Sequence, residues 1–325
     1  MTSSLETLRR SPARRAIPPT AAETRWALPD GHLLRRIDWS GRGRGSILFM
    51  PGRGDAYEKW LETLDGWHEE GWGVVSADWR GQAGSGRMGR DATTGHVPDF
   101  GLWVEDYAVL YASWAASTPG PHVAIAHSMG GQIVLRAVAE GLVVPDAIVL
   151  SAPMLGLHPS WLPSRLLHRV ARGIVRLGDP RRPAWKASER PSLPGSLAPQ
   201  ARSLLLTHDD SRYEDEQWWR QKRPALGMGP ASWGWVERAL ASICRLEQPG
   251  TLEAIMTPCL LLGTSIDGLV SWPAIRRAAE RLPLGELVSF GAECRHEILR
   301  EADPVRNRAL AAIRDFLDRH AAARA

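Results

Sequence analysis

The sequence predicts an α/β protein with a doubly wound, mostly parallel sheet and an inserted helical cap. Segments typical of buried strands alternate with segments of helical apolar spacing along most of the 325 residues. One stretch, 153–250, loses this alternation and is rich in proline, arginine and tryptophan. We therefore predict a flexible N-terminal arm at 1–22, a first part of the core at 23–152, the cap at 153–250 and a second part of the core at 251–325.

The predicted strands are short, apolar and rich in β-branched residues, as expected of parallel strands buried on both faces. They lie at 33–39, 45–50, 73–78, 122–127, 147–151, 258–263 and 286–290. Helical spacing of apolar residues predicts helices at 57–70, 100–116, 128–140, 273–281 and 304–320. Helices between consecutive strands are the crossovers that parallel pairing requires.

A candidate nucleophile lies in the stretch VAIAHSMGG at 123–131. An apolar strand runs into Ser128, and a helix follows, which is the pattern of a nucleophile elbow. Small residues two positions either side of the serine, Ala126 and Gly130, would let strand and helix approach closely, although glycine is more usual where Ala126 stands. A serine before two glycines is also typical of an ordinary helix start, so further motifs are needed.

A candidate acid and a candidate base follow in the order that such a site requires. Asp267 lies in the loop after the late apolar run PCLLLGT, and His296 follows the last predicted strand. Asp-Gly is a common turn signal in its own right, but serine, aspartate and histidine in this order match a catalytic triad. The aspartate would orient the imidazole, which would take the serine proton.

Five motifs in chain order resemble one family. They are PGRGDAYEKW at 51–60, SADWRGQAGSGR at 76–87, TGHVPDF at 94–100, AHSMGG at 126–131 and RHEILRE at 295–301. On these motifs, which span most of the chain, the sequence resembles α/β-hydrolases of the lysophospholipase and monoacylglycerol lipase branch. The PGR loop, the DWRGQ stretch and the GHV-DF pair are closer to bacterial lysophospholipases.

The resemblance implies an α/β-hydrolase fold and a serine hydrolase mechanism through an acyl-enzyme. It also implies that the backbone N–H groups of Arg53 and Met129 bind the oxyanion. The expected substrate is an ester of a single-chain lipid, either a lysophospholipid or a monoacylglycerol, and no cofactor or metal is expected. A short-chain carboxylesterase, a thioesterase and a non-catalytic binding protein of the same fold remain alternatives.

Composition limits the partners and the compartment. The formal net charge is +4, but no basic stripe interleaved with aromatic residues suggests nucleic acid. The three cysteines, Cys244, Cys259 and Cys294, lack the spacing of a disulfide framework or a zinc site, which favours a cytoplasmic location. No apolar run is long enough for a secretory signal or a membrane span. Oligomeric state and substrate-binding residues are left open.

Tryptophans are concentrated in the predicted cap. In that segment they could hold an acyl chain, contact a membrane surface peripherally, or pack the cap onto the sheet, and packing is the preferred interpretation for any one of them. The cap tryptophans are Trp161, Trp185, Trp218, Trp219, Trp233 and Trp235.

Other polar residues near the motifs are interpreted as structural. We expect Asp78 and His96 to order loops beside the site by satisfying buried backbone groups. His208, Asp209 and Asp210 are adjacent in the cap, where a solvated turn is a better interpretation than a metal site.

Overall fold

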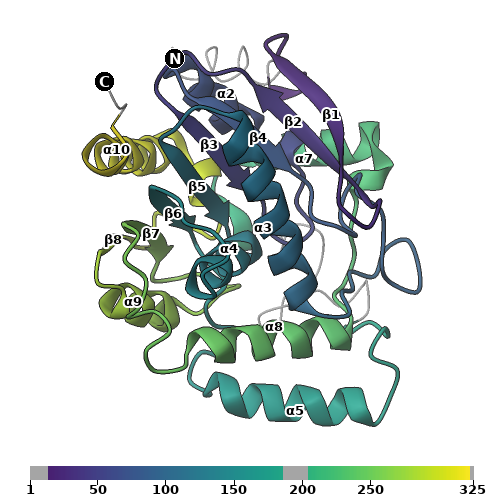
Figure 1. Ribbon diagram of the computed structural model, residues 1–325. Coiled ribbons are helices and arrows are strands. Elements are labelled where there is room, and N and C mark those ends of the chain that lie inside the picture. Colours follow the sequence, from purple (N-terminus) through teal and green to yellow (C-terminus); the bar gives the residue numbers. More distant parts are fainter. Residues whose placement is uncertain (1–13, 186–203, 323–325) are drawn as a thin grey trace.

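The computed structural model describes residues 14–185 and 204–322. Parts of the predicted arm, at 1–13, and of the predicted cap, at 186–203, lie outside these ranges. The described strands form one sheet in the order β1-β2-β4-β3-β5-β6-β7-β8 (Figure 1). Their bounds are β1 Ala21–Ala27, β2 Leu33–Trp39, β3 Ser46–Met50, β4 Gly73–Ala77, β5 His122–His127, β6 Ala147–Ser151, β7 Cys259–Thr264 and β8 Gly285–Phe290.

The sheet is mostly parallel, as predicted. Pairing is parallel from β4 through β3, β5, β6 and β7 to β8, whereas β1 with β2 and β2 with β4 are antiparallel. All seven predicted strands are present. The eighth, β1, was not predicted, because it is a largely exposed edge strand without an apolar run. The predicted boundary at residue 22 falls inside it.

The predicted helices are also present, and one of them is divided into two shorter elements. The segment 57–70 forms a 3₁₀ turn, η1 (Tyr57–Trp60), followed by α2 (Leu61–Glu69). The other core helices are α3 (Phe100–Ser117), α4 (Met129–Ala139), α9 (Trp272–Arg281) and α10 (Asp303–His320). The cap region contributes α5 (Ser164–Arg176), α7 (Asp210–Lys222), η2 (Pro224–Leu226) and α8 (Trp233–Leu246), and η3 (Ile298–Arg300) precedes α10.

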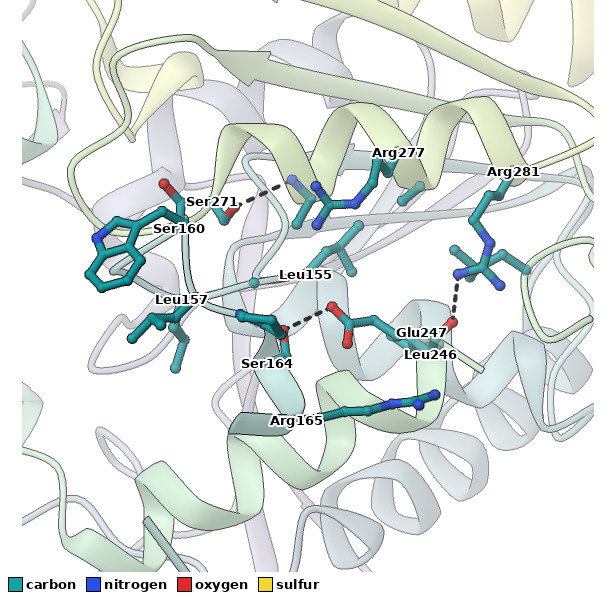
Figure 2. Close-up of a pocket in the computed structure, with 17 residues that line it drawn as sticks. Leu155, Leu157, Ser160, Ser164, Arg165, Leu246, Glu247, Ser271, Arg277 and Arg281 are labelled. Atoms are coloured by element: carbon teal, nitrogen blue, oxygen red, sulfur yellow. Dashed lines mark hydrogen bonds between the residues drawn. The ribbon is translucent and has the colours of Figure 1, made fainter. Parts of the chain in front are cut away.

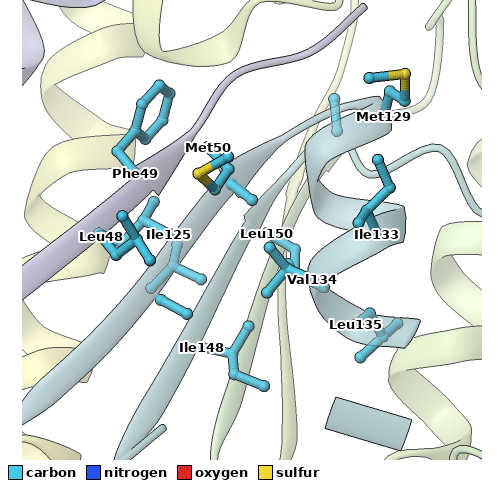
Figure 3. Close-up of a cluster of buried hydrophobic side chains, with 14 of the residues drawn as sticks. Leu48, Phe49, Met50, Ile125, Met129, Ile133, Val134, Leu135, Ile148 and Leu150 are labelled. Atoms are coloured by element: carbon cyan, nitrogen blue, oxygen red, sulfur yellow. The ribbon is translucent and has the colours of Figure 1, made fainter. Parts of the chain in front are cut away.

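The central strands and α4 share a densely buried apolar cluster (Figure 3). Every residue of β3, β4, β6 and β7 is buried, because helices cover both faces of a parallel sheet. Ile125 of β5 and Ile133 of α4 belong to this cluster on either side of the turn that carries Ser128. The turn therefore rests on a close-packed base that resists displacement.

Helices α5 and α8 of the predicted cap lie side by side below the sheet in Figure 1. Ser242 connects α8 to α4, since its Oγ accepts from Gln132 Nε2 at 2.5 Å and from Arg136 Nη1 at 3.0 Å. Trp219 and Trp235 are buried, which fits the packing interpretation, but Trp161 is 79% exposed.

The part of the predicted arm that the structure describes contacts α7. Arg14 and Arg15 both pair with Asp215 on α7, and Trp219 Nε1 donates to the Arg14 carbonyl oxygen at 3.0 Å.

The division into arm, core and cap stays a prediction. Within 14–185 and 204–322, no helix is both long enough and apolar enough to cross a membrane.

Candidate active site

Ser128 occupies a strained turn between β5 and α4. Its φ of 51° and ψ of −117° lie where non-glycine residues are uncommon, and such strain often marks functional positions. The turn is held from both sides, because Ser128 N–H donates to Ser151 O and Met154 N–H donates to Ser128 O, each at 2.9 Å. Ser128 is partly exposed between the buried residues His127 and Met129.

Gly130 makes the close approach of α4 to β3 possible. A β-carbon at this position would lie 2.4 Å from the Pro51 carbonyl oxygen and 2.7 Å from that of Met50, and neither backbone atom can move easily. Ala126, two residues before the serine, pairs between Met50 and Leu150 in the sheet and is fully buried. The methyl group at this position is therefore accommodated within the sheet.

The structure brings the three predicted residues into one chain of hydrogen bonds. His296 Nε2 lies 2.9 Å from Ser128 Oγ, and His296 Nδ1 lies 2.8 Å from Asp267 Oδ2. The other Asp267 oxygen accepts the backbone N–H groups of Leu269 and Val270 at 2.8 and 3.0 Å. The carboxylate is thus fixed by its own loop, and it in turn fixes the imidazole ring.

The charges of these groups follow from burial and pairing. Burial opposes ionisation of Asp267, but His296 and the two backbone N–H donors outweigh it and lower the pKa of the carboxyl group. Burial likewise disfavours protonated His296, but Asp267 outweighs it and raises the pKa of the imidazole. His296 is therefore prepared to accept a proton beside a fixed anion.

His127 is a neutral neighbour of this pair. Burial, and then His296, lower the pKa of the His127 ring well below its usual value. The ring lies between Trp60 and His296, with its centroid 4.8 Å from each. It fills space behind the His296 imidazole without adding a competing charge.

The loop at 51–55 runs directly past the candidate nucleophile. A β-carbon on Gly52 would lie 3.2 Å from the Cβ of Ser128, and Gly52 N–H donates to Asp55 Oδ2 at 3.2 Å. The Arg53 side chain extends toward the cap region, where Nη2 donates to Gly229 O at 2.9 Å. The backbone at Arg53 is thus held near Ser128, and its role as an oxyanion donor stays a prediction.

Gln82 is a site residue that sequence reasoning missed. Its Oε1 accepts the N–H of Gly54 at 2.6 Å, and its Nε2 lies 3.8 Å from Met129 Sδ. It therefore connects the 51–55 loop to the residue after Ser128. The surrounding stretch, 76–87, was recognised as a motif, but only the contact itself distinguishes Gln82 from other polar residues in that loop.

Asp78 and His96 make contacts that match their structural interpretation. Asp78 accepts from Arg35 Nε at 2.6 Å and from Gly84 N–H at 3.2 Å, which orders the loop after β4. His96 Nδ1 lies 2.8 Å from Ser232 Oγ, the N-cap of α8.

Two of the three residues considered as a possible metal site, His208 and Asp209, have structural contacts. His208 N–H and Nδ1 both lie 3.0 Å from carboxylate oxygens of Glu301, and Asp209 caps α7. Among the described residues, no group of three or more potential ligands could hold a metal ion.

A cavity of about 520 Å³ lies between the start of α5, the end of α8 and one side of α9 (Figure 2). Figure 2 shows Arg165 and Arg277 on opposite sides of it, and Ser164 Oγ donates to Glu247 at 2.8 Å. Ser128, Asp267 and His296 are not among its lining residues. The acyl-binding site is therefore not assigned to this cavity.

The mostly parallel sheet, the strained serine and its hydrogen-bonded histidine together define a protein of the α/β-hydrolase class. Residues 41–303 match the model of the family described as serine aminopeptidase, S33. The chain belongs to this family, in the branch that contains lysophospholipases and monoacylglycerol lipases.

Two bacterial relatives cover most of the chain. Lysophospholipase L2 of Escherichia coli strain K12 is 32% identical over 291 residues, which cover 84% of this chain and 80% of the relative. The probable lysophospholipase L2 of Haemophilus influenzae is 26% identical over 285 residues, which cover 85% of this chain and 84% of the relative.

Solved structures share the fold at low sequence identity. A soluble variant of monoglyceride lipase from Saccharomyces cerevisiae, in complex with a substrate analog, has a TM-score of 0.71 at 18% identity, covering 94% of this chain and 98% of that one. A monoacylglycerol lipase of Paleococcus ferrophilus has a TM-score of 0.64 at 20% identity, and the match covers 88% of this chain and 98% of that one. These likenesses confirm the predicted α/β-hydrolase fold.

Proposed function

We propose that the protein hydrolyses carboxylic esters of single-chain lipids, either lysophospholipids or monoacylglycerols, with Ser128 as nucleophile. The observation that carries this proposal is the hydrogen-bonded chain from Asp267 through His296 to Ser128 on a strained turn. The lipid substrate class is supported by the lysophospholipase relatives, whose similarity extends over most of the chain.

The geometry suits acyl transfer in two steps. Ser128 Oγ attacks the ester carbonyl carbon while His296 Nε2, 2.9 Å away, takes its proton. The backbone N–H groups of Arg53 and Met129 bind the oxyanion, and Asp267 stabilises the imidazolium. His296 then protonates the departing alcohol and afterwards activates the water that releases the fatty acid.

Helix α5 supports peripheral contact with a lipid surface, where such substrates reside. It contains no acidic residue, and its arginines Arg165, Arg169, Arg172 and Arg176 are all exposed. Leu177 at its end is 91% exposed. Exposed apolar groups beside a row of cations are typical of helices that lie on anionic membranes.

A cytoplasmic location belongs to the same proposal. The structure contains Cys244, Cys259 and Cys294 as free thiols, which are common in a reducing compartment.

The substrate class is tested by fatty acid release from a matched lysophosphatidylcholine and monoacylglycerol of one chain length, together with a short p-nitrophenyl ester. Wild type and Ser128→Ala are compared on each. Serine-dependent release from one of the lipids supports the proposal and identifies the preferred head group. Turnover of the short ester alone contradicts the lipid assignment and favours a general carboxylesterase, whereas no turnover by folded wild type favours a binding protein.

A further inference from the structure

A cluster of buried charges lies behind the candidate active site. The ammonium of Lys59, on η1, contacts Asp55 at 2.7 Å, Glu297 at 2.5 Å and Glu216 at 3.1 Å. All four side chains are at most 5% exposed. Charges in such surroundings are tolerated only when they are paired.

Two arginines complete the pairing. Arg300 contacts Glu297 and lies 3.4 Å from Glu216, and Arg220 lies 2.7 Å from Glu216. The carboxylates of Asp55, Glu216 and Glu297 are therefore balanced by three cations, which are Lys59, Arg220 and Arg300. Burial disfavours the charged form of Lys59, but its three carboxylate neighbours outweigh this and raise the pKa of the ammonium, so it stays protonated.

The three carboxylates come from three different parts of the molecule. Asp55 ends the 51–55 loop and accepts the N–H of Gly52, the residue that lies against Ser128. Glu297 directly follows His296 in the chain. Glu216 lies on α7, within the predicted cap. The ammonium thus joins the loop beside the nucleophile, the histidine segment and a cap helix at one point.

We propose that Lys59 is a positioning residue. It couples the position of α7 to the geometry of the 51–55 loop and of His296. The inference rests on the proposed hydrolase function and assigns an additional role to residues outside the triad. The lysine ammonium is a compact charge with three N–H donors. Here a different segment of the chain supplies each of the three carboxylates that it contacts. When Glu216 no longer attracts the ammonium, Lys59 shifts toward Asp55 and Glu297, and both active-site segments move with it.

Geometry rather than stability is the expected contribution of this cluster. A buried ionic cluster adds little net stability compared with apolar packing of the same volume, because the cost of desolvation offsets the attraction. Small displacements of catalytic groups, in contrast, have large effects on rate.

The test compares Glu216→Gln with Glu214→Gln. Both changes remove one carboxylate from α7, but Glu214 is exposed and outside the cluster. The measurements are kcat and KM on a p-nitrophenyl ester, and the rate at which a fluorophosphonate labels Ser128. Glu216→Gln should lower kcat and the labelling rate about 10-fold while KM changes less than about two-fold, as expected for misplaced catalytic groups. Glu214→Gln should match wild type.

Lys59 variants provide a second readout. Lys59→Arg keeps the charge, so it should retain more activity than Lys59→Met at equal folded fraction. Glu216→Gln decides the question if Lys59→Met does not fold. Equal kcat and labelling rates for Glu216→Gln and Glu214→Gln would overturn the inference, as would a rise in KM alone. Failure of the proposed function is distinguishable, because wild type and Ser128→Ala would then have the same activity.

Discussion

The turn that carries Ser128 and the predicted cap differ in the contacts that hold them. The turn is surrounded by fully buried apolar strands, and its geometry follows from close packing, as at Gly130. The predicted cap contacts the core through polar pairs, such as Glu216 with Lys59 and Ser242 with Gln132, in addition to buried apolar residues of α8. Apolar packing therefore positions the candidate nucleophile, whereas the predicted cap combines apolar packing with buried ion pairs that reach the active-site segments.

The largest effect should come from the nucleophile. Ser128→Ala should lower kcat on the order of 10⁶-fold, since losing the nucleophile removes the covalent pathway. Far-ultraviolet circular dichroism and the melting temperature should stay close to wild type. Residual turnover within 100-fold of wild type would show that another residue performs the attack.

The next effect concerns the acid. Asp267→Asn should lower kcat about 10⁴-fold, because the imidazole loses its orienting anion. Asp267 raises the pKa of His296, and activity requires the neutral ring, so the acidic limb of the kcat/KM profile should move to lower pH in this variant. A profile that keeps its acidic limb in place would mean that another carboxylate pairs with His296.

The packing of the turn is tested by a pair of glycine variants. Gly130→Ala should destabilise the protein by about 1–3 kcal/mol, because the added methyl would collide with the backbone of Pro51 and Met50. Gly66→Ala in α2 meets no atom within 4 Å and should stabilise by about 0.5–1 kcal/mol. Urea denaturation measures both, and similar changes in the two variants would contradict the close approach of α4 to β3.

The smallest effect is expected for a change on α5, at the exposed side of the predicted cap. Arg169→Gln should weaken binding to anionic vesicles about five-fold, since each cation near such a surface contributes about 1 kcal/mol. Arg25→Gln on the edge strand β1 is the matched control and should bind as wild type does. Vesicle flotation measures both, and equal binding by the two variants would remove α5 from the proposed contact surface.

Much of the fold was predictable, because the central strands are short apolar runs, typical of a buried parallel sheet, and alternate with helical spacing. Strand β1 was not, since backbone pairing with β2 holds it and its mostly exposed side chains leave no apolar pattern. Ser128, Asp267 and His296 were chosen as triad candidates by their positions after strands, and the structure brings them together. Gln82 and Lys59 were not, because their roles depend on partners distant in sequence.

The central claim, that Ser128 is the activated nucleophile, is tested most directly by fluorophosphonate labelling followed by peptide mapping in a mass spectrometer. A single adduct on Ser128 is predicted, forming much more slowly in Asp267→Asn. A folded wild-type protein that acquires no adduct, or acquires one on another residue, would contradict the account.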